Sequence, residues 1–240
     1  MKKQLDHAKE TIRPLTPEQT PLACDMTFWG RGYGVCVFRS PTLKKNLWWA
    51  ESLFETPGIY EEGLLKILRG GWKISGVVLD GKRGIAGVFR KHGIPVQYCQ
   101  FHQMKTVTKY LTRRPKTQAG WELRAITLSL SRTTEEIFQA ELLAWRSRWD
   151  EFLSEKTPCS CCKERFWPYT HRKLRAAFRS LKTNLSFLFT CQRYPELNLP
   201  NTTNCLDGMF SQIKNRLAVH RGLRRDRRYR LIDEILKNSN

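Results

Sequence analysis

Short apolar runs separated by turn residues predict a β-sheet in the first half of the chain. Residues 22–29 (LACDMTFW), 35–40 (VCVFRS) and 46–52 (NLWWAES) lie close together along the chain, so we expect three strands joined as antiparallel hairpins. Residues 74–80 (ISGVVLD) are almost wholly apolar, as in a central strand that is covered on both faces. A fifth strand is predicted at 94–102 (IPVQYCQFH).

Helical patterns interrupt and follow these strands. Residues 56–71 predict a helix because Pro57 lies near its start and two glycines end it. A short basic helix is expected within 82–93, and the strand–helix–strand order implies parallel neighbours with a right-handed crossover. Farther along, 133–156 has apolar residues at helical spacing after a Thr-x-x-Glu cap signature.

The last predicted helix, 204–220, is amphipathic, and its apolar face carries Leu206, Phe210, Ile213 and Leu217. Together these elements predict an α/β fold: a mixed five-stranded sheet flanked by helices, with a mostly helical insertion before the last helix. The expected divisions are an N-terminal tail and linker (1–20), the first part of the core (21–110), the helical insertion (111–200), and the last core helix with a basic C-terminal segment (201–240).

The charge balance indicates a polyanionic partner. The chain has 42 Lys and Arg against 22 Asp and Glu, a formal net charge of +20. Nucleic acid is the leading candidate, and an anionic membrane surface is the rival. No apolar stretch approaches the roughly 18 residues of a membrane span, and no signal peptide precedes the first strand. We therefore expect a cytoplasmic, DNA-associated chain with reduced cysteines and no membrane partner.

Two carboxylates are predicted to meet in the sheet. Asp80 ends the apolar fourth strand, and Asp25 lies in the first strand, which is its expected parallel neighbour. Ligands of such sheets bind at the carboxyl ends of the strands, near the point where the strand order reverses. Side-by-side carboxylates repel each other unless protons or cations lie between them, and Mg²⁺ prefers oxygen ligands. A third carboxylate would complete a two-metal site for in-line attack on a phosphodiester.

Four blocks occur in a fixed order: CDMTFWGRGYGVCVF, VVLDGKRGI, YCQFHQMK and TTNCLDGMFSQIKNRLAVHRGL. This ordered set resembles the catalytic core of DDE transposases of the Mutator-like class and their bacterial insertion-sequence relatives. The resemblance covers roughly residues 21–217. It implies a ribonuclease H-like fold with a helical insertion before the last acidic residue, and it implies catalytic, metal-binding roles for Asp25, Asp80 and Asp207.

The same resemblance implies an activity and partners. A transposase of this class uses two Mg²⁺ (or Mn²⁺) ions to cut DNA at transposon ends and to join the freed 3′ hydroxyl to target DNA. The expected partners are double-stranded DNA, as ends and as target, and further copies of the chain assembled on DNA. Cys99 and His102 match the Cys-x-x-His motif that follows the second acid of the family.

Two departures from the family keep alternatives open. Asp207 stands where relatives usually have glutamate, which is longer by about 1.5 Å. Relatives usually carry a separate N-terminal domain that recognises transposon ends, so we expect a truncated reading frame or a catalytic fragment. The first alternative is therefore a DNA-binding remnant without catalysis. The second is a ribonuclease H-like nuclease that acts on RNA–DNA hybrids.

Each acidic residue also has a plain structural interpretation. Asp25 could face solvent from an edge strand, and Asp80 could be only the Asp of an Asp-Gly turn. Asp207 could favour a helix N-terminus electrostatically, with Asn204 as the N-cap.

The cysteines and histidine have plain interpretations too. Cys99 and His102 could supply half of a zinc site, but a buried strand cysteine followed by a helix-capping or DNA-facing histidine is favoured. Zinc is likewise not favoured for the run CSCC at 159–162, because adjacent cysteines rarely converge on one metal.

The basic residues near these motifs are the expected phosphate contacts. The predicted DNA-binding residues are Lys82, Arg83, Lys105, Lys214, Arg216, Arg221, Arg224, Arg225, Arg227 and Arg228.

Overall fold

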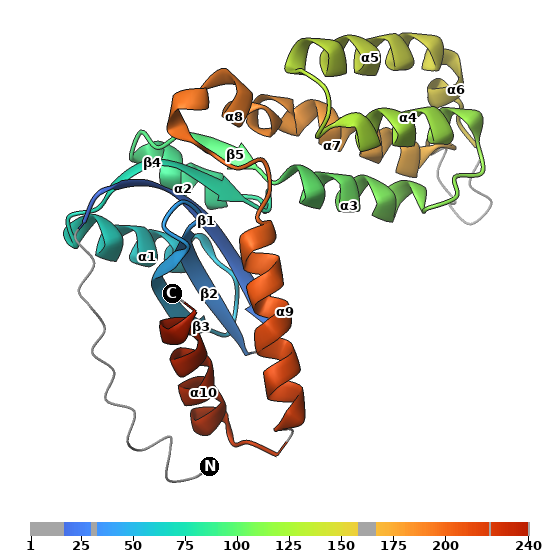
Figure 1. The fold of residues 1–240 in the computed structure, drawn as a ribbon. Coiled ribbons are helices and arrows are strands. Elements are labelled where there is room, and N and C mark those ends of the chain that lie inside the picture. Colours follow the sequence, from blue (N-terminus) through green and yellow to red (C-terminus); the bar gives the residue numbers. More distant parts are fainter. Residues whose placement is uncertain (1–16, 30–32, 158–166, 221, 240) are drawn as a thin grey trace.

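The computed structural model describes residues 17–29, 33–157, 167–220 and 222–239, and it contains one five-stranded sheet in the order β3-β2-β1-β4-β5. β1 pairs antiparallel with β2 and parallel with β4; β2 pairs antiparallel with β3, and β4 parallel with β5. This mixed sheet with flanking helices is an α/β fold of ribonuclease H-like arrangement, as the sequence predicts (Figure 1). The strands are β1 (Gln19–Phe28), β2 (Gly34–Ser40), β3 (Lys45–Ser52), β4 (Lys73–Leu79) and β5 (Val96–Tyr98).

Two strands differ from their expected bounds by more than one residue. β1 begins at Gln19, inside the predicted tail, and its register with β4 shifts between Thr20 and Pro21. Proline has no N–H to donate, so an irregularity in the ladder at this point is expected. At the other edge of the sheet, the strand predicted at 94–102 is too long, because β5 covers only Val96–Tyr98 and a helix begins at Gln100.

Two layers of helices cover the sheet (Figure 1). On one face, Leu22 and Cys24 of β1 share an apolar cluster with side chains of α1 and α2. On the other face, Ala23 of β1 shares a second cluster with side chains of α9 and α10. Since side chains alternate between the faces of a strand, Asp25 follows Ala23 onto the face that α9 covers. The covering helices are α1 (Pro57–Arg69), α2 (Ile85–Lys91), α9 (Asn204–Val219) and α10 (Arg225–Asn238).

The chain between β5 and α9 is mainly helical, and Figure 1 shows most of these helices extending away from the sheet. The helix predicted at 133–156 is two helices that meet at Trp149. The cap of the first is Thr134, whose Oγ1 accepts a hydrogen bond from the backbone N–H of Ile137 at 3.4 Å. These elements are α3 (Gln100–Leu111), α4 (Gln118–Ser129), α5 (Glu135–Arg148), α6 (Asp150–Ser154), α7 (Arg172–Leu188), α8 (Thr190–Arg193) and the 3₁₀ helix η1 (Pro195–Leu197).

A glycine in α1 lets this helix approach the sheet closely. A Cβ atom added to Gly63 would lie 2.5 Å from the Trp48 ring and 2.9 Å from the Phe38 ring. We therefore expect Gly63→Ala to lower the free energy of unfolding by about 1–3 kcal/mol, because the aromatic rings must move. Urea unfolding would measure the change. Gly58→Ala in the same helix is the control, because a Cβ atom added to Gly58 would have only Thr56 within 4 Å, at 3.8 Å. Equal losses of stability in the two variants would contradict the close packing of Gly63 on the sheet.

Candidate metal centre

Asp25 lies near the middle of the sheet and is buried. β1 has a neighbour on each side, and the Asp25 side chain is only 8 % exposed, so the interpretation of Asp25 as a solvent-facing residue of an edge strand is wrong. The backbone N–H of Met26 donates to Asp25 Oδ1 at 2.7 Å. A buried carboxylate with this single neutral donor is poorly compensated, so a further positive partner is expected.

Asp207 is brought to Asp25 by the packing of α9. The buried side chains of Leu206 and Phe210 join Ala23 in the second apolar cluster, and this places the first turn of α9 against β1. Asp207 Oδ2 is buried, and among the residues that the structure describes it has no hydrogen-bond partner. The predicted N-cap, Asn204, is instead the first residue of the helix, because the N-cap position belongs to Thr203.

His102 completes the cluster. It lies in the first turn of α3, and one ligand atom each from Asp25, His102 and Asp207 lie within 4.8 Å of one another. This group, with Asp25 buried and His102 and Asp207 half-buried, has the size and the donors to hold a metal ion. The sequence favours His102 as a helix-capping or DNA-facing residue, whereas in the structure its ring lies close to the two carboxylates.

Asp80 is a near neighbour of this group but not a member of it. The β1–β4 register pairs Ala23 with Val78, and the same register continued by two residues sets Asp80 beside Asp25. Asp80 Oδ1 also accepts a hydrogen bond from the backbone N–H of Lys82 at 2.8 Å, so the turn interpretation describes a real contact. The turn contact is compatible with metal binding by Asp80, because the turn uses only one of the two carboxylate oxygens.

The electrostatics of the group favour a cation. Burial, followed by the nearby charge of Asp80, raises the pKa of Asp25 from 3.8 to about 7, although the Met26 N–H and His102 oppose this shift. The pKa of His102 is raised, first by a hydrogen bond to Cys99 and further by the charges of Asp25 and Asp207. Without a metal, the group therefore holds a proton more tightly than ordinary aspartates do, and a divalent cation would relieve the same repulsion.

Cys99 and Thr203 connect the two helices that carry His102 and Asp207. Cys99 is buried as predicted, but it is the N-cap of α3 and not a strand residue. Its Sγ accepts from both the N–H and the Oγ1 of Thr203, each at 3.4 Å, and Thr203 Oγ1 lies 3.4 Å from His102 Nδ1. Burial acts to raise the pKa of Cys99, but hydrogen bonds from His102 and Thr203 lower it overall. No pattern in the sequence indicates this role of Thr203.

The predicted DNA-binding residues lie mostly on the surface. Lys82 is engaged with Glu55 at 2.9 Å, and Arg225 forms an ion pair with Glu51. Arg228 is half-buried, whereas Arg221 and the cysteines of 159–162 lie outside the described residues. The exposed members of the predicted DNA-binding set are Lys82, Arg83, Lys105, Lys214, Arg216, Arg224, Arg225 and Arg227.

Among the described helices, none is long and apolar enough to cross a membrane.

No protein-family model matches the chain, and no curated protein sequence is significantly similar to it.

Proposed function

We propose that this chain is a metal-dependent DNA transposase of the DDE type, with an Asp-Asp-Asp set at Asp25, Asp80 and Asp207. The observation that carries the proposal is the convergence of Asp25, His102 and Asp207, which come from three distant segments, on the buried face of a ribonuclease H-like sheet. The reaction proposed is cleavage of phosphodiesters at transposon ends, followed by joining of the 3′ hydroxyl to target DNA. The proposed partners are double-stranded DNA and further copies of the chain on it.

The carboxylates of the donor set fit Mg²⁺ or Mn²⁺, whereas the His102 imidazole is a ligand typical of transition metals and not of Mg²⁺. Carboxylate oxygens suit both ions, and the unpartnered Asp207 Oδ2 is a free acceptor already aimed into a buried site. Asp25, His102 and Asp207 would hold one ion, and Asp80 beside Asp25 would contribute to a second. When bound, such ions act as Lewis acids that activate a hydroxyl and stabilise the leaving oxygen.

The residues of the chain would provide position and charge. Asp25 is fixed by the central strand and by the Met26 N–H, while His102 is oriented through Cys99 and Thr203. The exposed arginines of α10 and of the turn before it would bind the phosphates that flank the scissile bond. α9 packs directly on β1, and this packing would bring the shorter aspartate at 207 within reach of a metal ion.

The direct test is metal-dependent nicking of a duplex that carries the inverted repeats flanking this reading frame. We expect cleavage with Mg²⁺ or Mn²⁺ and none with EDTA. Asp80→Asn is expected to lower cleavage about tenfold or more while binding of the same duplex is nearly unchanged. An Asp80→Asn protein that cuts as well as the parent would show that this residue has no part in the reaction.

Two alternatives give different results in the same experiments. A DNA-binding remnant is suggested by the aspartate at 207, and it predicts salt-sensitive DNA binding but no calorimetric heat on titration with Mn²⁺. A ribonuclease H-like nuclease is suggested by the strand order, and it predicts that an RNA–DNA hybrid competes better than the inverted-repeat duplex.

The contact between Thr203 and His102 gives a milder prediction. Thr203→Val keeps the shape of the side chain but removes the Oγ1 atom that both Cys99 and His102 contact. Because such supporting contacts orient a metal ligand, we expect the affinity for Mn²⁺ to fall about 10-fold in calorimetry. Thr202→Val, at the half-exposed preceding residue, is the control and should bind Mn²⁺ as the parent does. Equal affinities in all three proteins would mean that Thr203 does not position His102.

A further inference from the structure

A second site lies at the far end of α3 from the metal centre. An open pocket of about 460 Å³ is formed where the end of α3 meets the beginnings of α4 and α7. His102 is in the first turn of α3 and Tyr110 is in its last, so about eight residues of helix, roughly 12 Å, separate the two places. The size falls within the range of about 300–1,000 Å³ that is usual for ligand sites.

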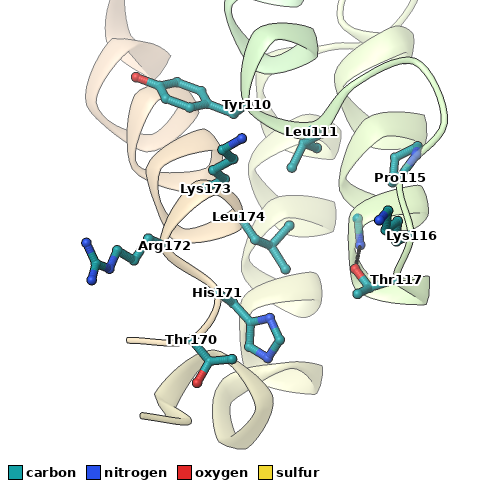
Figure 2. A pocket seen from close by; sticks show the side chains of 11 residues that line it. Tyr110, Leu111, Pro115, Lys116, Thr117, Thr170, His171, Arg172, Lys173 and Leu174 are labelled. Atoms are coloured by element: carbon teal, nitrogen blue, oxygen red, sulfur yellow. Dashed lines mark hydrogen bonds between the residues drawn. The ribbon is translucent and has the colours of Figure 1, made fainter. Parts of the chain in front are cut away.

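The pocket has an apolar centre and cations at its sides. Figure 2 shows Leu111 and Leu174 in the middle, Tyr110 and Lys173 on one side, and Lys116 on the other. No acidic side chain is among the lining residues that the structure describes. His171 also lines the pocket, but its Nε2 lies 2.9 Å from Glu155 Oε2, so we do not count it among the free cations.

This combination matches one class of ligand. An apolar centre bordered by a tyrosine ring accepts the flat face of a nucleobase, and flanking lysines accept the phosphates on either side of it. A base inside a duplex is stacked and cannot enter such a pocket. We propose that this pocket binds an unstacked base of single-stranded nucleic acid, together with its neighbouring phosphates.

A neighbouring surface extends the same chemistry. Arg172 points away from the other labelled side chains in Figure 2, and it also lines a second pocket of about 340 Å³ with Lys156, Trp167 and Tyr169. The Trp167 side chain is 55 % exposed, and the guanidinium carbon of Arg175 lies 3.6 Å from the centre of the Tyr169 ring. Aromatic rings interleaved with cations are typical of surfaces that follow a single strand. The adjoining surface therefore gives a strand a path out of the first pocket.

The phosphate contacts are tested with a fluorescein-labelled dT12 oligonucleotide and fluorescence anisotropy. We expect Lys116→Ala/Lys173→Ala to weaken binding at least tenfold. We also expect the slope of log K against log salt to become shallower by about 1.4, because two phosphate contacts of a single strand are lost. The matched control is Lys91→Ala/Arg132→Ala, which removes two exposed cations outside the pocket. Equal losses in the two double variants would overturn the proposal.

The base contact is tested at Tyr110, which lines the pocket and is 37 % exposed. Tyr110→Ala is expected to weaken dT12 binding about 5-fold to 100-fold, whereas Tyr110→Phe keeps the ring and should bind as the parent does. An abasic oligonucleotide of the same length should bind the parent and Tyr110→Ala proteins equally. If the parent protein binds the abasic strand as tightly as dT12, the pocket does not recognise a base.

Two further measurements distinguish nucleotide recognition in this pocket from general binding of anions and from the activity of the metal centre. A polyglutamate peptide of equal charge that displaces dT12 as well as unlabelled dT12 does would contradict nucleotide recognition. The inference does not depend on catalysis at the metal centre, so dT12 binding should persist in EDTA, where no metal-dependent cleavage occurs. If nicking fails in every protein but the Tyr110 and lysine effects appear, the proposed function is wrong and the single-strand site stands.

Discussion

Asp25→Asn is expected to abolish metal-dependent DNA cleavage, with a loss of at least about 100-fold. The substitution keeps the shape of the side chain but removes a negative charge from the centre of the Asp25–His102–Asp207 group. A bound metal provides several kcal/mol of charge stabilisation in such reactions, and each 1.36 kcal/mol corresponds to about a factor of ten in rate. Nicking of the inverted-repeat duplex under single-turnover conditions would measure the loss, and calorimetry should show much weaker Mn²⁺ binding.

The matched control for this variant is Asp150→Asn. Asp150 is exposed at the start of α6 and pairs with Arg146, far along the chain from the metal centre. Its loss should leave both cleavage and Mn²⁺ binding unchanged, since exposed ion pairs contribute little. Cleavage that survives in Asp25→Asn would mean that the buried group is structural and that any activity lies elsewhere.

The same Asp25→Asn protein is expected to be more stable than the parent when metal is absent. The pKa of Asp25 in the folded chain is about 7, against an ordinary value of 3.8, because burial and Asp80 disfavour its charge. The folded state therefore binds the proton more tightly than the unfolded state. The contribution of Asp25 to the free energy of unfolding of the parent is therefore highest at low pH. It falls between about pH 4 and pH 7 and is constant above that range.

The full shift corresponds to about 4 kcal/mol at 1.36 kcal/mol per pKa unit, which is the most that Asp25→Asn can restore at pH 8. Urea unfolding of chelator-treated protein at pH 5 and pH 8 would measure it. The stability advantage of the variant should be about 1.6 kcal/mol at pH 5 and about 4 kcal/mol at pH 8. Excess Mg²⁺ should narrow the difference at pH 8, because the parent binds it more tightly; Mg²⁺ at 100 times the dissociation constant adds about 2.7 kcal/mol to the parent, which offsets more than half of the advantage of the variant. An advantage that does not change with pH would refute the raised pKa.

Loss of activity together with a gain in stability is the pattern that separates a functional carboxylate from a structural one. Replacement of a buried acid that is retained only for packing would lower both activity and stability. Here the burial of the Asp25 charge, and next its repulsion from Asp80, cost folding free energy, so the retention of Asp25 needs a reason outside folding.

Much of the sheet could be predicted from the sequence because its strands are apolar. The near-continuous apolar run of β4 correctly predicted a strand between two neighbours, and it correctly paired this strand with β1. That pairing is what predicted the proximity of Asp25 and Asp80. Asp207 was found through the resemblance, and its approach to Asp25 follows from the apolar face of α9.

The start of α3, and with it the role of His102, could not be read from hydropathy. The buried positions in the first turn of this helix are Gln100 and Gln103, so its inward face carries no apolar signal there. The side-chain amide of Gln100 donates to the Leu188 carbonyl at 2.9 Å, and that of Gln97 in β5 donates to the same carbonyl at 2.8 Å. These tertiary contacts with the end of α7 decide where the strand stops, and they are invisible to a local pattern.

The separation of the metal ligands along the chain also has a consequence during synthesis. A ribosome releases β1 and α3 early, but Asp207 emerges only after all the helices between β5 and α9 have been made. A nascent chain that has folded its sheet still lacks the third ligand and the helix that buries the other two. The complete Asp25–His102–Asp207 group would then arise only in one late step of translation, and a prematurely ended product would lack it.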